Sequence, residues 1–292
     1  MTTTLNAAIA AAALQLTLLA APLVAAQDLS ATATQTGNSN VASLDQASVL
    51  FTTATVTQLG DGNTAVTRQR DTLEADIVAY QEGQRNAAVL YQTSVFPFLI
   101  QTSQTGADNR ISIDQLDSGF AGPIVTQVGV GNQATIRQYQ DYYSSIGIAQ
   151  TGQRNSAGIT QTAAYFTDGN LVRQDGADNR ATVFNSGQEN GIRVNQFGTA
   201  NVANTYNNGA ASTTLVDQTG ERNMATTEQR QFSNYSNVTQ FGNQLTASVL
   251  QTGTVASPLF SNLATIAQTG ERHAARVVQN GAGNQGIILQ QE

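Results

Sequence analysis

The sequence predicts an all-β fold: a β-solenoid of about eleven two-stranded rungs with a repeat of 22–24 residues. One six-residue motif recurs at nearly constant spacing, apolar and variable positions alternate on both sides of it, and a glycine occupies the same place in every copy. Self-similarity at a fixed period is typical of repeat architectures, so the period is assigned before any single element.

The motif is Gln-x-Gly-x-x-Asn, and its copies follow one another along almost the whole chain. Successive opening glutamines are 23 residues apart for five steps and then 24, 22, 22, 22 and 28 apart. In the last two copies Leu245 and His273 replace the asparagine. The opening glutamines are Gln35, Gln58, Gln81, Gln104, Gln127, Gln150, Gln174, Gln196, Gln218, Gln240 and Gln268.

A second amide divides each unit into two halves. It stands six residues after the asparagine position, so each half has about eleven residues. Some second halves carry the motif themselves, as Gln279-Asn280-Gly281-Ala282-Gly283-Asn284 does. The second amides are Gln46, Gln69, Gln92, Gln115, Gln138, Gln161, Asn185, Asn207, Gln229, Gln251 and Gln279.

Alternation around the motif predicts two strands per unit. Two residues before the opening glutamine stand mainly aliphatic residues such as Val56 and Ile148, and two residues after the asparagine position alanine dominates. The positions between them vary freely, as Asp45, Arg68 and Tyr91 do in one column. Period-2 alternation indicates strands with one buried face.

The third motif position predicts a tight turn between the two strands. Glycine reaches positive φ without steric cost, which a sharp turn often requires. Each unit is therefore a strand, a glycine turn, a strand and a second turn. Stacked at about 4.8 Å per rung, the units form a column on the order of 50 Å long. The turn glycines are Gly37, Gly60, Gly83, Gly106, Gly129, Gly152, Gly176, Gly198, Gly220, Gly242 and Gly270.

The amides share the parity of the apolar columns, so we expect them to point inward. A buried amide costs a few kcal/mol unless it is hydrogen-bonded. Identical stacked amides can bond to the copies above and below, as in the Asn/Gln ladders of cross-β stacks. The sequence therefore predicts structural ladders of both glutamine columns and of the motif asparagines. These asparagines are Asn40, Asn63, Asn86, Asn109, Asn132, Asn155, Asn179, Asn201 and Asn223.

The extended pattern Gln-x-Gly-x-x-Asn-x-Ala-x-x-x-Gln resembles the repeat of the curlin family, the subunits of bacterial curli amyloid fibres. It is matched in full by six units, for example Gln58–Gln69 and Gln218–Gln229. The resemblance implies export through a dedicated outer-membrane curli secretion channel and nucleated self-assembly into a homopolymer, a pilus-like extracellular fibre at the bacterial cell surface. It also implies a role in biofilm matrix and cell adhesion. Both the major fibre subunit and a specialised nucleator that pairs with a major curlin subunit fit this pattern.

The N-terminal residues predict a targeting segment. Residues 1–26 have no charged side chain, are rich in Ala and Leu, and end with Val24-Ala25-Ala26. This composition predicts a secretory signal peptide cut after Ala26, residues 27–34 as a short leader, and residues 35–292 as the solenoid. An uncleaved membrane anchor is the alternative, because this stretch is about long enough to span a bilayer.

Composition excludes several classes of function. The net charge is −7, all 13 basic residues are Arg, and there is no Cys. A partner made of nucleic acid is therefore not expected, because phosphate contacts supply most of that affinity, and a disulfide framework is impossible. His273 is the only histidine, so no imidazole pair exists for a metal site or a triad. We expect no enzyme activity, with no catalytic, cofactor-binding or metal-ligating residue.

Two other solenoid functions compete with the fibre. An ice-binding solenoid needs outward threonine ladders, and the column before the opening glutamine is interrupted, for example by Tyr80 and Arg173. A monomeric solenoid adhesin at the cell surface remains the main alternative. We expect fibres because the sequence shows no capping helix beside either end of the stack, and unpaired strand edges favour head-to-tail addition.

Overall fold

The computed structural model describes residues 2–8, 13–19, 30–120, 122–165, 169–253 and 261–291, with side chains described from residue 30 onward apart from Phe98. Throughout these ranges the chain forms strands and turns, which confirms the all-β prediction. No helix in the described residues is long and apolar enough to cross a membrane. The chain divides into two units, Met1–Tyr142 and Tyr143–Glu292.

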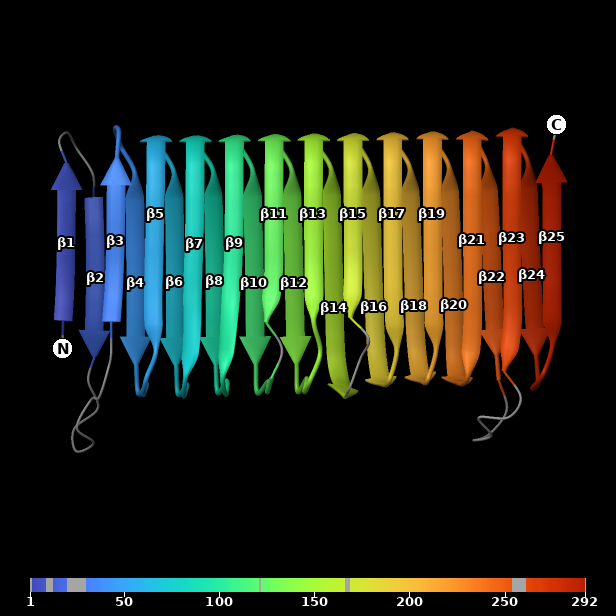
Figure 1. Ribbon diagram of the computed structural model, residues 1–292, viewed down its shortest axis with the longest axis horizontal. Coiled ribbons are helices and arrows are strands. Elements are labelled where there is room, and N and C mark those ends of the chain that lie inside the picture. Colours follow the sequence, from blue (N-terminus) through green and yellow to red (C-terminus); the bar gives the residue numbers. More distant parts are fainter. Residues whose placement is uncertain are drawn as a thin grey trace. The chain divides into compact units, whose positions relative to one another are not determined.

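Unit 1 consists of two parallel sheets. Along the chain the strands alternate between the sheets, and odd-numbered strands run opposite to even-numbered ones (Figure 1). One sheet contains β1 (Thr2–Ala8), β3 (Ser30–Thr36), β5 (Thr53–Asp61), β7 (Ala75–Gln84), β9 (Phe98–Ala107) and β11 (Pro123–Val130). The other contains β2 (Ala13–Leu19), β4 (Val41–Ala47), β6 (Thr64–Arg70), β8 (Ala87–Thr93), β10 (Arg110–Leu116) and β12 (Gln133–Tyr139).

Unit 2 repeats this arrangement, again with parallel neighbours in each sheet (Figure 1). One sheet contains β13 (Ile146–Gln153), β15 (Asn170–Ala177), β17 (Gly191–Thr199), β19 (Thr213–Glu221), β21 (Asn234–Asn243), β23 (Asn262–Glu271) and β25 (Gln285–Gln291). The other contains β14 (Ser156–Tyr165), β16 (Arg180–Gln188), β18 (Val202–Ala210), β20 (Met224–Phe232), β22 (Thr246–Thr252) and β24 (Ala274–Asn280).

Pairing follows the sequence repeat without offset. Gln58 pairs with Gln81 in unit 1, and Gln174 pairs with Gln196 in unit 2. Each rung therefore places equivalent residues directly beside one another in the parallel ladder. The predicted β-solenoid of about eleven turns is confirmed.

The interior is a narrow double column of small and aliphatic side chains. Burial alternates along the strands, as in β5 and β8, and the buried positions are those that the alternation predicts. Ala65 and Ala88 next to the turns are fully buried, as are Val56 and Ile266 before the glutamines. Because each buried Val or Ile side chain contributes roughly 1.5–3 kcal/mol, the repeat of this column stabilises every rung.

The second turn accounts for the variation in repeat length. Ala54, four residues before Gln58, lies eight residues after Gln46, whereas Ser236, four residues before Gln240, lies seven after Gln229. One extra residue in this turn thus gives the 23-residue steps, and the shorter turn gives the 22-residue steps. The 28-residue step contains residues 254–260, which lie outside the described residues.

The N-terminal segment pairs with the first repeat. β1 runs parallel to β3, and β2 runs parallel to β4. The predicted cleavage position after Ala26 lies outside the described residues. The first strand of the repeat begins at Ser30, so most of the predicted leader 27–34 belongs to β3.

Candidate functional site

The opening glutamines form a continuous hydrogen-bonded ladder within each unit. In unit 1 the Nε2 atom of Gln58 donates to Oε1 of Gln81 at 2.7 Å, and Gln81 donates likewise to Gln104 at 2.7 Å. In unit 2 the bonds from Gln150 to Gln174 and onward measure 2.8–2.9 Å. The donor always points to the following rung, so the ladder has a direction.

Each of these amides uses its second N–H in the same way. Nε2 of Gln58 also donates to the Val41 carbonyl at 3.0 Å, and Nε2 of Gln174 donates to the Ser156 carbonyl at 3.0 Å. These carbonyls belong to the first residue of a strand in the opposite sheet. The ladder therefore joins successive rungs and also joins the two sheets of a rung. It satisfies buried amides whose burial would otherwise cost a few kcal/mol each.

The opening-glutamine ladder extends one residue beyond the predicted set. Nε2 of Gln268 donates to Oε1 of Gln290 at 2.8 Å, and Gln290 lies in β25. Gln290 follows Gln268 by 22 residues, so the repeat spacing alone could have predicted its place in the ladder.

The second glutamine column also forms a ladder, but a less uniform one. In unit 1, Gln46 donates to Gln69 at 2.6 Å, and Gln115 donates to Gln138 at 2.7 Å. In unit 2 the ladder runs from Gln229 through Gln251 to Gln279, with both bonds at 2.8 Å. Asn185 and Asn207 are shorter and bond instead to polar residues of the opposite sheet, Asn170 and Thr214 respectively. Gln161 is fully buried in β14, as predicted for this column.

The motif asparagines hold the glycine turns. Nδ2 of Asn86 donates to the Glu82 carbonyl of its own turn at 3.1 Å and to the Gly106 carbonyl of the next rung at 3.0 Å. Its Oδ1 accepts the backbone N–H of Asn109 at 3.1 Å. All nine predicted asparagines are fully buried. They thus fix the turn within a rung and bind it to the next rung.

The glycines are required both by conformation and by stacking. All eleven motif glycines have φ between 100° and 140°. A Cβ built on Gly83 would lie 2.0 Å from the Gly106 carbonyl oxygen, a distance that real Cβ atoms do not reach. The turns therefore stack through their backbones with no room for a side chain.

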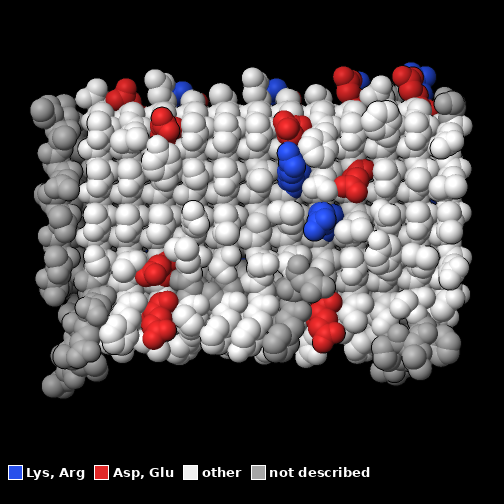
Figure 2. Space-filling view, viewed as in Figure 1, with Lys and Arg blue, Asp and Glu red and all other residues white. Residues whose placement is uncertain are grey.

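The residue before each motif asparagine lies in the left-handed region and points outward. Arg85 (φ 51°) donates to both carboxylate oxygens of Asp108 at 2.8 Å, and this holds the pKa of Asp108 below its ordinary value. Arg154 and Asp178 form the same bidentate pair in unit 2, at 2.7 and 2.8 Å. These two pairs therefore link adjacent rungs. The face seen in Figure 2 is largely uncharged.

In the last two glycine turns Leu245 and His273 replace the motif asparagine, although Asn223 still donates to the Gly242 carbonyl at 2.8 Å. The backbone N–H of Leu245 still donates to Asn223 Oδ1 at 3.0 Å, but its side chain has no donor for the next turn. The buried Nε2 of His273 makes no hydrogen bond to any described residue.

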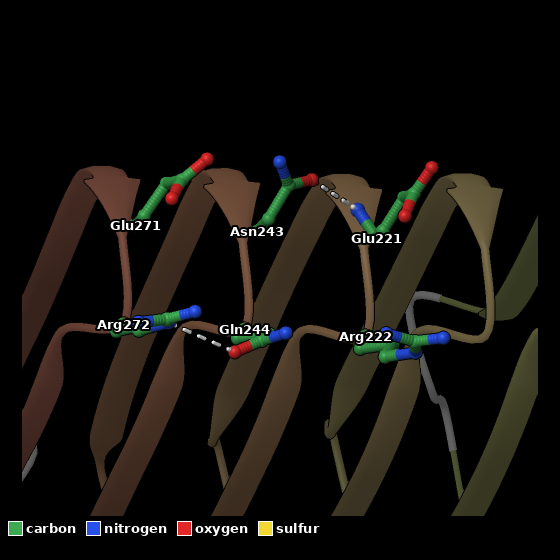
Figure 3. Close-up of a pocket in the computed structure, with 6 residues that line it drawn as sticks. All are labelled: Glu221, Arg222, Asn243, Gln244, Glu271 and Arg272. Carbon is green, nitrogen blue, oxygen red and sulfur yellow. Dashed lines mark hydrogen bonds between the residues drawn. The ribbon is translucent and has the colours of Figure 1, made fainter.

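A shallow hollow of about 220 Å³ lies outside these turns, lined by Glu221, Arg222, Asn243, Gln244, Glu271 and Arg272 (Figure 3). Arg272 Nε donates to Gln244 Oε1 at 3.3 Å across it. Among the described residues no group of His, Asp and Glu is placed to hold a metal ion.

Unit 2 contains a second column of turn contacts. In its second turns, Asn190 donates to the Gly209 carbonyl at 2.9 Å and Asn262 donates to the Gly281 carbonyl at 2.7 Å. The turn that ends at Asn190 has the spacing of the glycine turn, because Asn185-x-Gly187-x-x-Asn190 is the motif with asparagine in place of glutamine. Both ends of a 22-residue rung are therefore closed in the same way.

Comparisons of the chain with family models and with curated proteins found no match.

Proposed function

We propose that this chain is a secreted, non-enzymatic structural subunit that self-assembles into extracellular curli-like amyloid fibres for biofilm matrix and surface adhesion. One observation carries the proposal: within each unit, every rung binds the next through the same backbone pairing and the same amide ladder. The rung surface is therefore complementary to its own repeat.

Self-complementary rungs favour association between copies of the chain. A contact between the two different ends of a stack is heterologous, and a heterologous contact that does not close produces a fibre. Like charges opposed across such a contact would weaken it. The low charge of the chain, 11% of its residues, reduces that repulsion.

The buried polar groups of the opening ladder are engaged in structural hydrogen bonds. The buried amides of the opening ladder use both N–H groups on neighbouring rungs and on the opposite sheet. Two exposed arginines of the turns pair with carboxylates of the next rung, Arg85 with Asp108 and Arg154 with Asp178. Both features support a structural protein over an enzyme.

The partners follow from the likeness of the repeat to that of curlins. They are further copies of the chain, a second fibre subunit that acts as nucleator or as major curlin, and an outer-membrane secretion channel. Export requires removal of residues 1–26.

Fibre diffraction of purified residues 27–292 tests the proposal. We expect reflections at about 4.7 Å and about 10 Å, the strand and sheet spacings. Monomer should convert to fibre with a concentration-dependent lag that preformed fibre abolishes. A stable monomer that is never seeded would reject the fibre and favour the alternative, a solenoid adhesin displayed as a single chain.

A further inference from the structure

The edge formed by β24 and β25 presents hydrogen-bond donors. Ladder bonds run from Nε2 of one rung to Oε1 of the next, and Gln279 and Gln290 are the last described members of their ladders. Nε2 of Gln279 donates to the Leu263 carbonyl at 2.8 Å, and Nε2 of Gln290 donates to the Ala274 carbonyl at 3.2 Å. A primary amide has two N–H groups, so each residue retains one for a following rung.

The edge formed by β3 and β4 presents the matching acceptors. Gln35 and Gln46 donate onward to the next rung. The Oε1 atom of Gln46 is buried and has no hydrogen-bond partner among the described residues.

The segment that covers this edge does not extend the ladders. By backbone register, Ala7 pairs with Gln35 and Leu18 pairs with Gln46. Neither residue type has a side-chain donor. Among the described residues no side chain therefore donates to the acceptor end of either ladder.

The order of the strands decides which strands meet. Each new strand of the spiral is added to the sheet opposite the one before, so the strand after β25 belongs beside β24. The turn between β24 and β25 is Gln279–Asn284, and the turn between β3 and β4 is Gln35–Asn40, with the same motif. Placing β3 beside β25 instead would leave β4 with no strand to pair with.

We propose that a second copy of this chain, freed of residues 1–26, docks with its β3 beside β24 and its β4 beside β25. The inference rests on the proposed function and specifies its interface. Gln279 then donates to Gln35 of the second copy, and Gln290 donates to the buried Oε1 of Gln46.

The same register matches the remaining positions. In the interior, Ala33 and Leu44 of the second copy lie beside Val277 and Ile288 respectively. On the outer surface, Thr34 and Asp45 of the second copy lie beside Val278 and Leu289 respectively. No like charges face each other. Asn40 falls beside Asn284, so the asparagine contacts continue across the interface.

Disulfide mapping tests this register, because the chain has no Cys. Single-cysteine variants T34C, V278C, D45C and L289C of residues 27–292 are mixed in pairs, assembled and oxidised. Adjacent parallel strands place Cα atoms about 4.8 Å apart, within disulfide range, whereas outward residues of opposite sheets are more than about 10 Å apart. We expect cross-linked dimers for T34C with V278C and for D45C with L289C. We expect no cross-linked dimer for T34C with L289C or for D45C with V278C.

Every variant is used in one matched and one mismatched mixture, so a poorly folded variant gives no cross-linked dimer in either. Circular dichroism of each variant identifies that case, and the pair is then replaced by S43C with I287C. Fibres in which T34C cross-links to L289C, or in which no matched pair cross-links, would overturn this register and leave the fibre proposal intact. Failure of the unmodified chain to form fibres would overturn both.

Discussion

Replacing Gln81 with leucine tests the ladder directly. The substitution removes three hydrogen bonds: the one accepted from Gln58 at 2.7 Å, and those donated to Gln104 at 2.7 Å and to the Thr64 carbonyl at 3.0 Å. It leaves one N–H of Gln58 and Oε1 of Gln104 buried without partners. At about 1–3 kcal/mol for each unpaired group, the loss is roughly 2–6 kcal/mol.

The leucine side chain recovers part of that loss. Its burial contributes about 1.5–3 kcal/mol, so we expect Q81L to lower the free energy of unfolding by about 2 kcal/mol. With a guanidinium m-value of about 5 kcal/mol/M, the midpoint should fall by about 0.4 M. Circular dichroism of freshly dissolved, unassembled protein measures this shift. The control is T57L on the neighbouring rung, which points outward and should change stability by less than about 0.5 kcal/mol.

A double variant separates a ladder from isolated polar residues. In Q81L/Q104L the number of unpaired groups does not increase, because Gln58 and Gln127 now flank the gap. The second substitution should therefore cost no more than about 1 kcal/mol, because substitutions in one bonded network are not additive. Equal, additive losses for the two substitutions would refute the ladder.

Three further outcomes are expected. G83A should prevent the rung from folding, because the added Cβ would collide with the carbonyl of the next turn. G62A (φ 68°) should lower the free energy of unfolding by only about 1–2 kcal/mol. Equal melting curves for the two variants would contradict the backbone stacking of the turns. The folded-state pKa of Asp108 is lowered by Arg85, so the stabilisation from this pair is present above the unfolded pKa of about 3.9 and is lost as pH falls through the folded pKa. Carbon-detected NMR titration should show this low pKa and its return toward the ordinary value in R85Q. L245N should raise the unfolding midpoint by restoring an asparagine side chain that can donate to the carbonyl of the next turn. An unchanged or lower midpoint would count against a stabilising role for that hydrogen bond.

The sequence could predict which residues point inward, because parity and period depend only on position. Val56 and Gln58 share one parity within their strand, as Ala65 and Gln69 do within the next, and the structure buries all four. Parallel in-register pairing follows in the same way, because an exact repeat aligns its own copies. The glycine turn was also predictable, since so few residue types reach positive φ.

Hydrogen-bond direction could not be predicted, because it depends on side-chain torsions that position alone does not fix. The sequence predicts that Asn86 points inward, but it does not predict the two hydrogen bonds that Asn86 donates to turn carbonyls. The 23-residue spacing places Arg85 and Asp108 on adjacent rungs, but their bidentate pairing also depends on side-chain torsions. Gln290 was outside the predicted set, yet it belongs to the ladder.

The two kinds of second turn give the proposed interface its selectivity. In unit 1 these turns are wider and lined by buried residues such as Val49 and Val95, with Phe51 and Phe96 exposed outside. The β24–β25 edge instead has the compact motif turn, Gln279–Asn284. At the β3–β4 edge only Gln35–Asn40 has that form, because the following turn carries one more residue. A copy shifted by one strand would stack a wide turn on a compact one and lose the asparagine contacts. The variation in repeat length thus specifies the register of docking.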